Sequence, residues 1–268
     1  MKSFFSKFLG ISFGRKVINR LNLVYPYYMN GEMFIEHQKR WLDFPPDILN
    51  KLHFIIVDDG SPHKPAIDFF LDNRRHLNID IYRIDIDKPW NNNGARNLGA
   101  LFCINEWIFL SDMDHFLPLE SVKAILTLQA NRFEYFMFKR LDAKESWKNI
   151  FELKPYKPHM STFLIHWHSY WEAGGYNEEY CGQYGMSWLF RRRLKRIGRE
   201  RKLNAHVVRY TRNIVSDAHT ATLTRKCDVE IKQIKKNYKK NKKLWQSSPL
   251  NPLRFPWHIE YSSRKQIV

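Results

Sequence analysis

Short hydrophobic segments alternate along this chain with segments of helical periodicity. Continuous apolar runs predict strands at residues 21–25, 53–57, 79–84 and 107–110. Apolar residues at helical spacing predict helices at 32–42, 67–77 and 95–103, and the segment Phe44-Pro45-Pro46 ends the first of them. Strands that alternate with helices in this way are typical of βαβ units. We therefore expect an α/β fold with a mostly parallel sheet and flanking helices.

Two of these predicted strands end in pairs of aspartates. Asp58 and Asp59 follow the second strand, and Asp112 and Asp114 follow the fourth. A buried strand does not hold adjacent carboxylates, so these side chains must emerge at the strand ends. Open α/β sheets bind ligands at the carboxyl ends of their strands. The pattern predicts one site that binds a polar, metal-bound ligand.

Composition limits the class of protein. The 268 residues are 44% hydrophobic and 15% aromatic, which is enough for a core and excludes general disorder. The three cysteines are far apart and odd in number, which favours a reduced, cytoplasmic protein over a disulfide scaffold. No apolar run approaches the roughly 20 residues of a membrane span. Near the N-terminus Lys7 interrupts the apolar run, which indicates either a surface amphipathic segment or a packed helix instead of a signal peptide.

The positive charge is concentrated in two segments. The net charge is +17, and residues 191–243 contain 19 Lys and Arg against four acidic residues. The first twenty residues add five positive charges and no negative ones. We expect three parts: a basic N-terminal segment over 1–20, an α/β domain over 21–225 and a basic helical tail over 226–268. Residues 191–196 and 232–243 are expected on helices, either as solvated faces or as contacts to a polyanion.

Four sequence blocks occur in an order that resembles the GT-A nucleotide-sugar glycosyltransferases, in particular the large inverting family 2. The blocks are Val57-Asp58-Asp59-Gly60-Ser61, Asn93-Gly94-Ala95-Arg96-Asn97, Leu110-Ser111-Asp112-Met113-Asp114 and Glu172-Ala173-Gly174-Gly175-Tyr176-Asn177-Glu178. Together they span about 120 residues between the first and the last. The resemblance implies a GT-A fold and transfer of a sugar from a nucleotide-diphosphate sugar to a hydroxyl group.

The resemblance also implies roles for individual residues. Asp112 and Asp114 would hold Mn²⁺ or Mg²⁺ with the diphosphate, since a cation neutralises the charge that develops on the leaving phosphate. The residues implied to contact the nucleotide are Asp58, Asp59, Asp85, Arg96 and Asp112. Two alternatives remain open: one of the first two aspartates is only a turn cap, and Arg96 is a surface arginine. The implied third metal ligand is His219, with His166 and His168 as competitors.

The chain departs from the family pattern where the catalytic base is expected. In the family an acidic pair precedes a Leu-x-x-Arg-Leu helix, and here those positions are Met186 and Ser187. Neither can act as a general base. The remaining candidates are Glu178, Glu179 and Asp217; otherwise the chain is a catalytically altered relative. The arginines that follow at 191–193 would suit a negatively charged acceptor.

The acceptor is expected to be a surface polysaccharide or glycolipid, reached from the cytoplasm at the inner face of an anionic membrane. Two alternatives stay open. One is a DNA glycosyltransferase that acts on a hydroxylated base, for which nucleic acid would be the partner. The other is a non-catalytic GT-A-like protein that uses its basic face to bind a polyanion.

Overall fold

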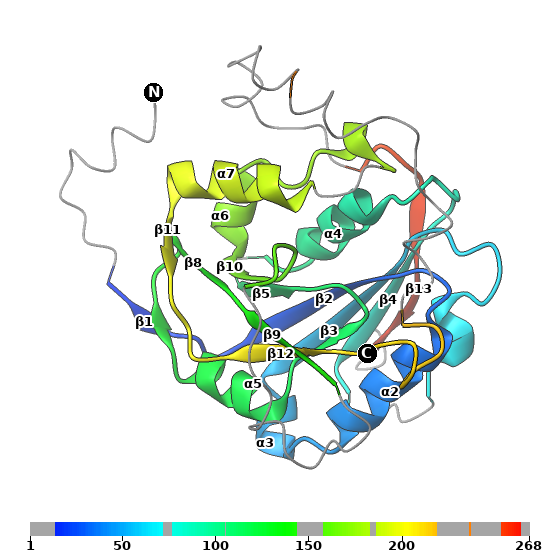
Figure 1. Cartoon of the computed structure of the whole chain (residues 1–268), viewed down its shortest axis with the longest axis horizontal. Coiled ribbons are helices and arrows are strands. Elements are labelled where there is room, and N and C mark those ends of the chain that lie inside the picture. The colour runs from blue at the N-terminus through cyan, green and yellow to red at the C-terminus, as the bar shows by residue number, and fades with distance from the viewer. Residues whose placement is uncertain are drawn as a thin grey trace.

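An eight-stranded sheet forms the centre of the molecule (Figure 1). The structure is a computed structural model that describes residues 14–71, 77–104, 106–143, 158–182, 186–218, 236 and 253–263. The strand order is β11-β8-β10-β5-β2-β3-β4-β13. The bounds are β2 Leu21–Tyr27, β3 Leu52–Asp58, β4 Ile79–Ile84, β5 Trp107–Leu110, β8 Glu134–Met137, β10 Phe163–His166, β11 Arg199–Arg201 and β13 Trp257–Ser262.

The middle of this sheet is parallel, as the sequence predicted. Strand β2 pairs in parallel with β3 and β5, and β3 pairs in parallel with β4. Strand β10 is antiparallel to β5 and β8, and β13 is antiparallel to β4. Two smaller sheets complete the strands: β1 (Lys16–Val17) with β7 (Gln129–Ala130), and β6 (His115–Phe116) with β12 (His206–Arg209) and β9 (Lys139–Asp142).

Helices cover both faces of the central sheet (Figure 1). One face carries α2 (Gly31–Leu42), α3 (Pro46–Leu49) and α5 (Leu119–Leu126). The other carries α4 (Asn92–Leu101), α6 (Trp167–Glu172) and α7 (Ser187–Ile197). The short 3₁₀ helices η1 (Ala66–Phe69) and η3 (Glu178–Tyr180) lie in connections of the described chain. Among the described helices, none combines the length and the apolar character needed to cross a membrane.

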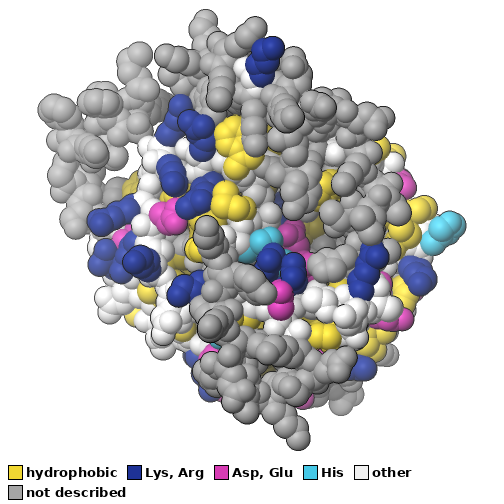
Figure 2. Space-filling model, viewed as in Figure 1, with side chains coloured by type: hydrophobic (Ala, Val, Ile, Leu, Met, Phe, Trp, Pro, Cys, Tyr) yellow, Lys and Arg dark blue, Asp and Glu magenta, His cyan; other side chains and the backbone are white. Residues whose placement is uncertain are grey.

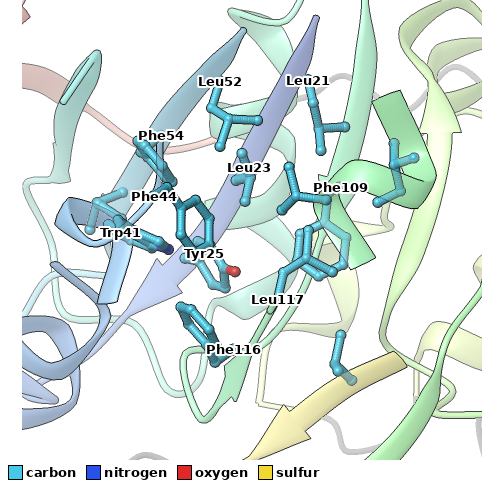
Figure 3. Close-up of a cluster of buried hydrophobic side chains, with 14 of the residues drawn as sticks. Leu21, Leu23, Tyr25, Trp41, Phe44, Leu52, Phe54, Phe109, Phe116 and Leu117 are labelled. Carbon is cyan, nitrogen blue, oxygen red and sulfur yellow. The ribbon is translucent and has the colours of Figure 1, made fainter. Parts of the chain in front are cut away.

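Each strand of the parallel region contributes to two hydrophobic cores because both of its faces are buried. Leu23 and Tyr25 of β2 lie in the core beneath α2, α3 and α5, while Val24 lies in the core beneath α4. In the first core Trp41 of α2 stacks on Phe54 of β3, with ring centroids 4.2 Å apart (Figure 3). Burial on both faces explains why these strands are continuous apolar runs without alternation.

The helix predicted over 67–77 is wrong. In the described part of this range the chain forms only η1, and Phe70 is already extended with φ −74° and ψ 116°; residues 72–76 lie outside the described residues. The side chain of Gln38 in α2 donates to the carbonyl of Phe69 and accepts from the amide of Leu71. These contacts hold the backbone in an extended path where the next helical turn would have formed.

The C-terminal region also differs from the expected helical tail. Strand β13 lies within 226–268, yet it pairs with β4 and forms the edge of the central sheet. This part of the chain therefore belongs to the α/β domain. The helix predicted at 232–243 lies outside the described residues, apart from Lys236, and the boundary at residue 225 stays a prediction.

Candidate active site

The carboxyl ends of four parallel strands lie along one edge of the sheet. Strand β2 lies between β3 and β5, with Tyr27 beside Asp58 and Val24 beside Leu110. The segments that follow β3, β4 and β5 therefore start at the same edge. They carry the two aspartate pairs and Asp85, so the sheet gathers these groups on one side of the molecule.

Asp58 serves the turn after β3. Its carboxylate is fully buried and accepts the amide hydrogens of Ser61 and Ala66, each at 2.8 Å. Desolvation raises the pKa of Asp58, although these amides and Arg83, 3.4 Å away, favour the ionised form. Gly60 has φ +70°, and a Cβ there would lie 2.4 Å from the carbonyl oxygen of Ile86. The geometry of Asp58 is that of the turn cap.

The other nucleotide candidates at this edge have different surroundings. Asp59 is buried, and its amide donates to the carbonyl of Tyr27 at 2.9 Å. Asp85 is partly exposed and lies 2.5 Å from Nδ1 of His258 in β13. The C-terminal strand therefore reaches the edge where the ligand was expected.

Arg96 of α4 is paired with Asp112, which excludes the surface-arginine alternative. The arginine is 1% exposed, and its Nη2 donates to Oδ1 of Asp112 at 2.5 Å. Its Nε donates to Asn92 at 2.8 Å, and its Nη1 donates to the carbonyl of Ser161 at 2.7 Å. The guanidinium also lies 5.3 Å from the ring centre of Tyr176. Desolvation works against ionisation of Asp112, but Arg96 together with His159 and His115 outweighs it, so the pKa of Asp112 lies below its usual value.

Two histidines lie beside Asp112. One ligand atom each of Asp112, His115 and His159 lies within 4.8 Å of the other two. The rings of His115 and His159 are stacked, with centroids 4.3 Å apart and planes at 21°. Asp114 lies next to this group, with its Oδ1 2.5 Å from Nδ1 of His115. Desolvation, assisted by the neighbouring His115, lowers the pKa of His159 to about 4. The imidazole of His159 is therefore neutral at physiological pH.

The sequence did not predict this group. His115 directly follows Asp114, so its position beside the aspartates could have been noticed. His159 is 47 residues from Asp112, is part of no motif and is brought in only by the fold. The predicted ligand His219 lies outside the described residues. Nδ1 of His166 accepts the amide of His168 at the start of α6, so this pair serves a helix end.

The three candidate bases lie in different environments. Glu178 is 8% exposed and accepts from the side chain of Asn97 at 2.7 Å and from the amides of Leu253 and Arg254 at 2.9 and 3.0 Å. Glu179 is exposed and pairs with the side chain of Arg254 at 3.2 Å.

Asp217 lies at the N-terminus of α2. It accepts the amides of Glu32 and Met33 at 2.8 and 3.0 Å, and desolvation raises its pKa. Two of the three carboxylates, those of Glu178 and Asp217, therefore hold backbone amides in place.

The position without a carboxylate lies close to Arg96. Ser187 at the start of α7 contacts the hydroxyl of Ser161 at 3.0 Å and that of Tyr176 at 3.3 Å. Tyr176 in turn accepts from Arg96 at 3.3 Å. A hydroxyl network therefore lies where the resemblance implied an acidic side chain.

The arginine run of α7 divides among three environments. Arg191 pairs with Glu200 at 2.9 Å, while Arg193 is buried and donates to the carbonyl of Gly175. The exposed cations of α7 and the segment after it form a surface that we call the basic face, which consists of Arg192, Lys195, Arg196, Arg199 and Lys202. Figure 2 shows many Lys and Arg side chains on the side of the molecule where α7 and β11 lie.

No protein-family model and no curated protein matches the sequence. The structure is similar to S. aureus TarS 1–349, with 15% identity and a TM-score of 0.53, over 80% of this chain and 68% of that one. It is also similar to GalNAc-T7 bound to UDP, GalNAc and Mn²⁺, with 11% identity and a TM-score of 0.55, over 72% of this chain and 44% of that one. A third similar structure is the mannosyltransferase PcManGT from Pyrobaculum calidifontis in complex with GDP-Man and Mn²⁺. The identity is 13% and the TM-score 0.53, over 78% of this chain and 63% of that one.

These similarities confirm the predicted fold. The chain has the GT-A architecture of nucleotide-sugar glycosyltransferases, with its mostly parallel sheet and flanking helices. It spans less than two thirds of the length of GalNAc-T7 and PcManGT.

Proposed function

We propose that this protein is a metal-dependent glycosyltransferase that moves a sugar from a nucleotide-diphosphate sugar to a hydroxyl acceptor. The observation that carries the proposal is the group at the carboxyl edge of the sheet, where Asp112 pairs with buried Arg96 and lies beside two histidines. Structural neighbours with the same fold were solved with UDP-GlcNAc, or with Mn²⁺ and either UDP or GDP-Man.

The residues at Asp112 fit a divalent cation. Carboxylate oxygen and imidazole nitrogen are both common ligands of such ions, and the Nε2 atom of His115 is buried without a hydrogen-bond partner among the described residues. A bound cation would neutralise the charge that develops on the leaving diphosphate. Arg96 holds Asp112 in one orientation and keeps it ionised, while Asp58 and Gly60 fix the turn after β3.

Among the three candidate bases, Glu179 is the one we propose for deprotonating the acceptor. Its carboxylate is exposed and, among the described residues, pairs with the side chain of Arg254, whereas Glu178 and Asp217 hold backbone amides. Glu179 lies in η3, which contacts the start of α4 because Asn93 donates to the carbonyl of Asn177 at 3.1 Å. An exposed carboxylate can accept a proton without breaking the structure around it.

The basic face favours the hypothesis that the acceptor, or the membrane surface that carries it, is anionic. It carries five exposed cations, and the Glu200 carboxylate within the same stretch is paired with Arg191. We propose a surface polysaccharide or glycolipid at the cytoplasmic face of an anionic membrane, since clustered cations bind such surfaces. Binding to duplex DNA and to anionic vesicles should be compared at low and high salt, for wild type and for a variant with Arg192, Lys195 and Arg196 changed to Ser. Preference for DNA would favour the DNA-modifying alternative instead.

The direct test of the donor is calorimetric titration with UDP and GDP, with and without Mn²⁺. We expect metal-dependent binding of one nucleotide and its loss in Asp112→Asn. Asp47→Asn is the matched control because Asp47 is exposed in the first turn of α3. Absence of metal-dependent binding of any nucleotide would refute the proposal.

A second measurement separates an enzyme from a binding protein with the same fold. Glycosyltransferases commonly hydrolyse their donor slowly when no acceptor is present, so a panel of nucleotide sugars can be assayed for release of the free sugar. Hydrolysis of one donor supports the enzyme. Tight polyanion binding without hydrolysis of any donor would support the non-catalytic alternative.

A further inference from the structure

We propose that Asp112, His115 and His159 form a mixed oxygen–nitrogen site for a transition-metal dication, and that Asp114 orients His115 without binding the ion. The role of this ion in catalysis rests on the proposed function, but its binding can be measured alone. The proposal replaces the ligand set that the resemblance implied, which was Asp112, Asp114 and His219.

The distances suit a shared ion. Two ligand atoms on one ion, with bonds of about 2.1 Å, lie at most about 4.2 Å apart. The three ligand atoms of this group lie within 4.8 Å of one another. Small side-chain rotations are therefore enough for all three to reach one ion.

Each residue has an atom available for the ion. The hydrogen bonds from Arg96 and Asn92 both reach Oδ1 of Asp112, and Oδ2 takes part in neither. In the described part of the chain, Nε2 of His115 is buried without a hydrogen-bond partner while Nδ1 lies beside Asp114. Nδ1 of His159 contacts the hydroxyl of Thr162 at 3.0 Å, which leaves its Nε2 as the ligand atom.

Asp114 occupies the position that commonly supports a metal-binding histidine. A carboxylate that accepts Nδ1–H of an imidazole fixes the tautomer, so that Nε2 presents its lone pair to the ion. The contact between Asp114 Oδ1 and His115 Nδ1 is 2.5 Å long. The amide of Tyr210, directly after β12, also donates to the Asp114 carbonyl at 2.8 Å, which anchors Asp114 to the end of that strand.

The ligand set predicts which ions bind. Mg²⁺ prefers oxygen ligands and keeps most of its water, whereas imidazole suits first-row transition metals. A site with two imidazoles and one carboxylate should therefore bind Mn²⁺, Co²⁺ and Zn²⁺ more tightly than Mg²⁺. We expect a preference for Mn²⁺ over Mg²⁺ of at least about tenfold.

The test is calorimetric titration of the metal-free full chain with MnCl₂ and MgCl₂, in the absence of nucleotide. We expect one Mn²⁺ per chain, affinity at least about tenfold lower in His159→Gln, and affinity about 10- to 100-fold lower in Asp114→Asn. His168→Gln, an exposed histidine in α6, is the matched control and should bind as wild type does. Circular dichroism and thermal unfolding check that each variant folds.

Pulsed electron paramagnetic resonance of the Mn²⁺-bound wild type tests the same ligands without mutation. Coupling to imidazole nitrogen supports the site, and its absence overturns it. Equal affinity for Mg²⁺ and Mn²⁺ together with an unaffected His159→Gln variant would also overturn it. If Mn²⁺ binds as expected but no nucleotide does, the proposed function fails while the metal site stands.

Discussion

The Glu178 carboxylate should stabilise the C-terminal strand instead of acting as a catalytic base. It accepts three hydrogen bonds, two of them from the amides of Leu253 and Arg254, a few residues before β13. The substitution Glu178→Gln keeps the shape but replaces one acceptor oxygen by an amide donor that faces another donor. Hydrogen bonds to a charged group contribute about 1.5–3 kcal/mol each, so we expect a loss of about 2–4 kcal/mol.

Urea denaturation measures the total loss, and hydrogen exchange measured by mass spectrometry locates it. Faster exchange is expected first at residues 257–262, because β13 is the edge strand of the described sheet and pairs there with β4 alone. Glu179→Gln is the matched control: it removes an exposed ion pair, which contributes at most about 1 kcal/mol. As the proposed base, Glu179 should instead affect turnover, with donor hydrolysis falling about 10²- to 10⁴-fold in this variant.

The two variants therefore give opposite results if the reasoning holds. Glu178→Gln should lose stability and Glu179→Gln should lose activity. Unchanged urea stability and unchanged exchange of β13 in Glu178→Gln would refute the structural role of Glu178. If Glu178→Gln kept its stability but lost donor hydrolysis, Glu178 would be the better candidate for the base.

Three further predictions concern buried groups. Burial lowers the pKa of His37 to about 4, so the unfolded chain takes up a proton below its pKa of about 6.5 while the folded chain does not. The free energy of unfolding should therefore fall by about 2 kcal/mol between about pH 7 and pH 5. Urea titrations of His37→Gln at the two pH values should not show this His37-dependent loss. Gly60→Ala should lose at least about 2 kcal/mol in the same assay, because its φ of +70° and the Ile86 carbonyl at 2.4 Å both oppose a Cβ. Arg96→Lys keeps the charge but cannot reproduce the bonds around Asp112, so we expect a lower thermal midpoint and weaker nucleotide binding in calorimetry.

The sequence alone determined the architecture because its signals are local. Apolar runs of strand length must be buried, and carboxylates cannot remain inside them. A window of a few residues is therefore enough to predict where each strand lies and where its polar end begins. The strands at 79–84 and 107–110 were predicted with the bounds that the structure has. The other two predicted strands, at 21–25 and 53–57, agree with the structure to within two residues at each end. The convergence of Asp58 and Asp112 at one edge followed from parallel pairing.

The tertiary structure decided which groups meet and what each one does. Local sequence could not show that Gln38 would hold Phe69 and Leu71 in an extended backbone, or that the C-terminal segment would supply an edge strand. The same holds for the site: Glu178 and Asp217 look like free carboxylates until the fold brings backbone amides to them. His159 joins Asp112 because its amide donates to the carbonyl of Phe138, between β8 and β9, a contact between distant parts of the chain that no local pattern encodes.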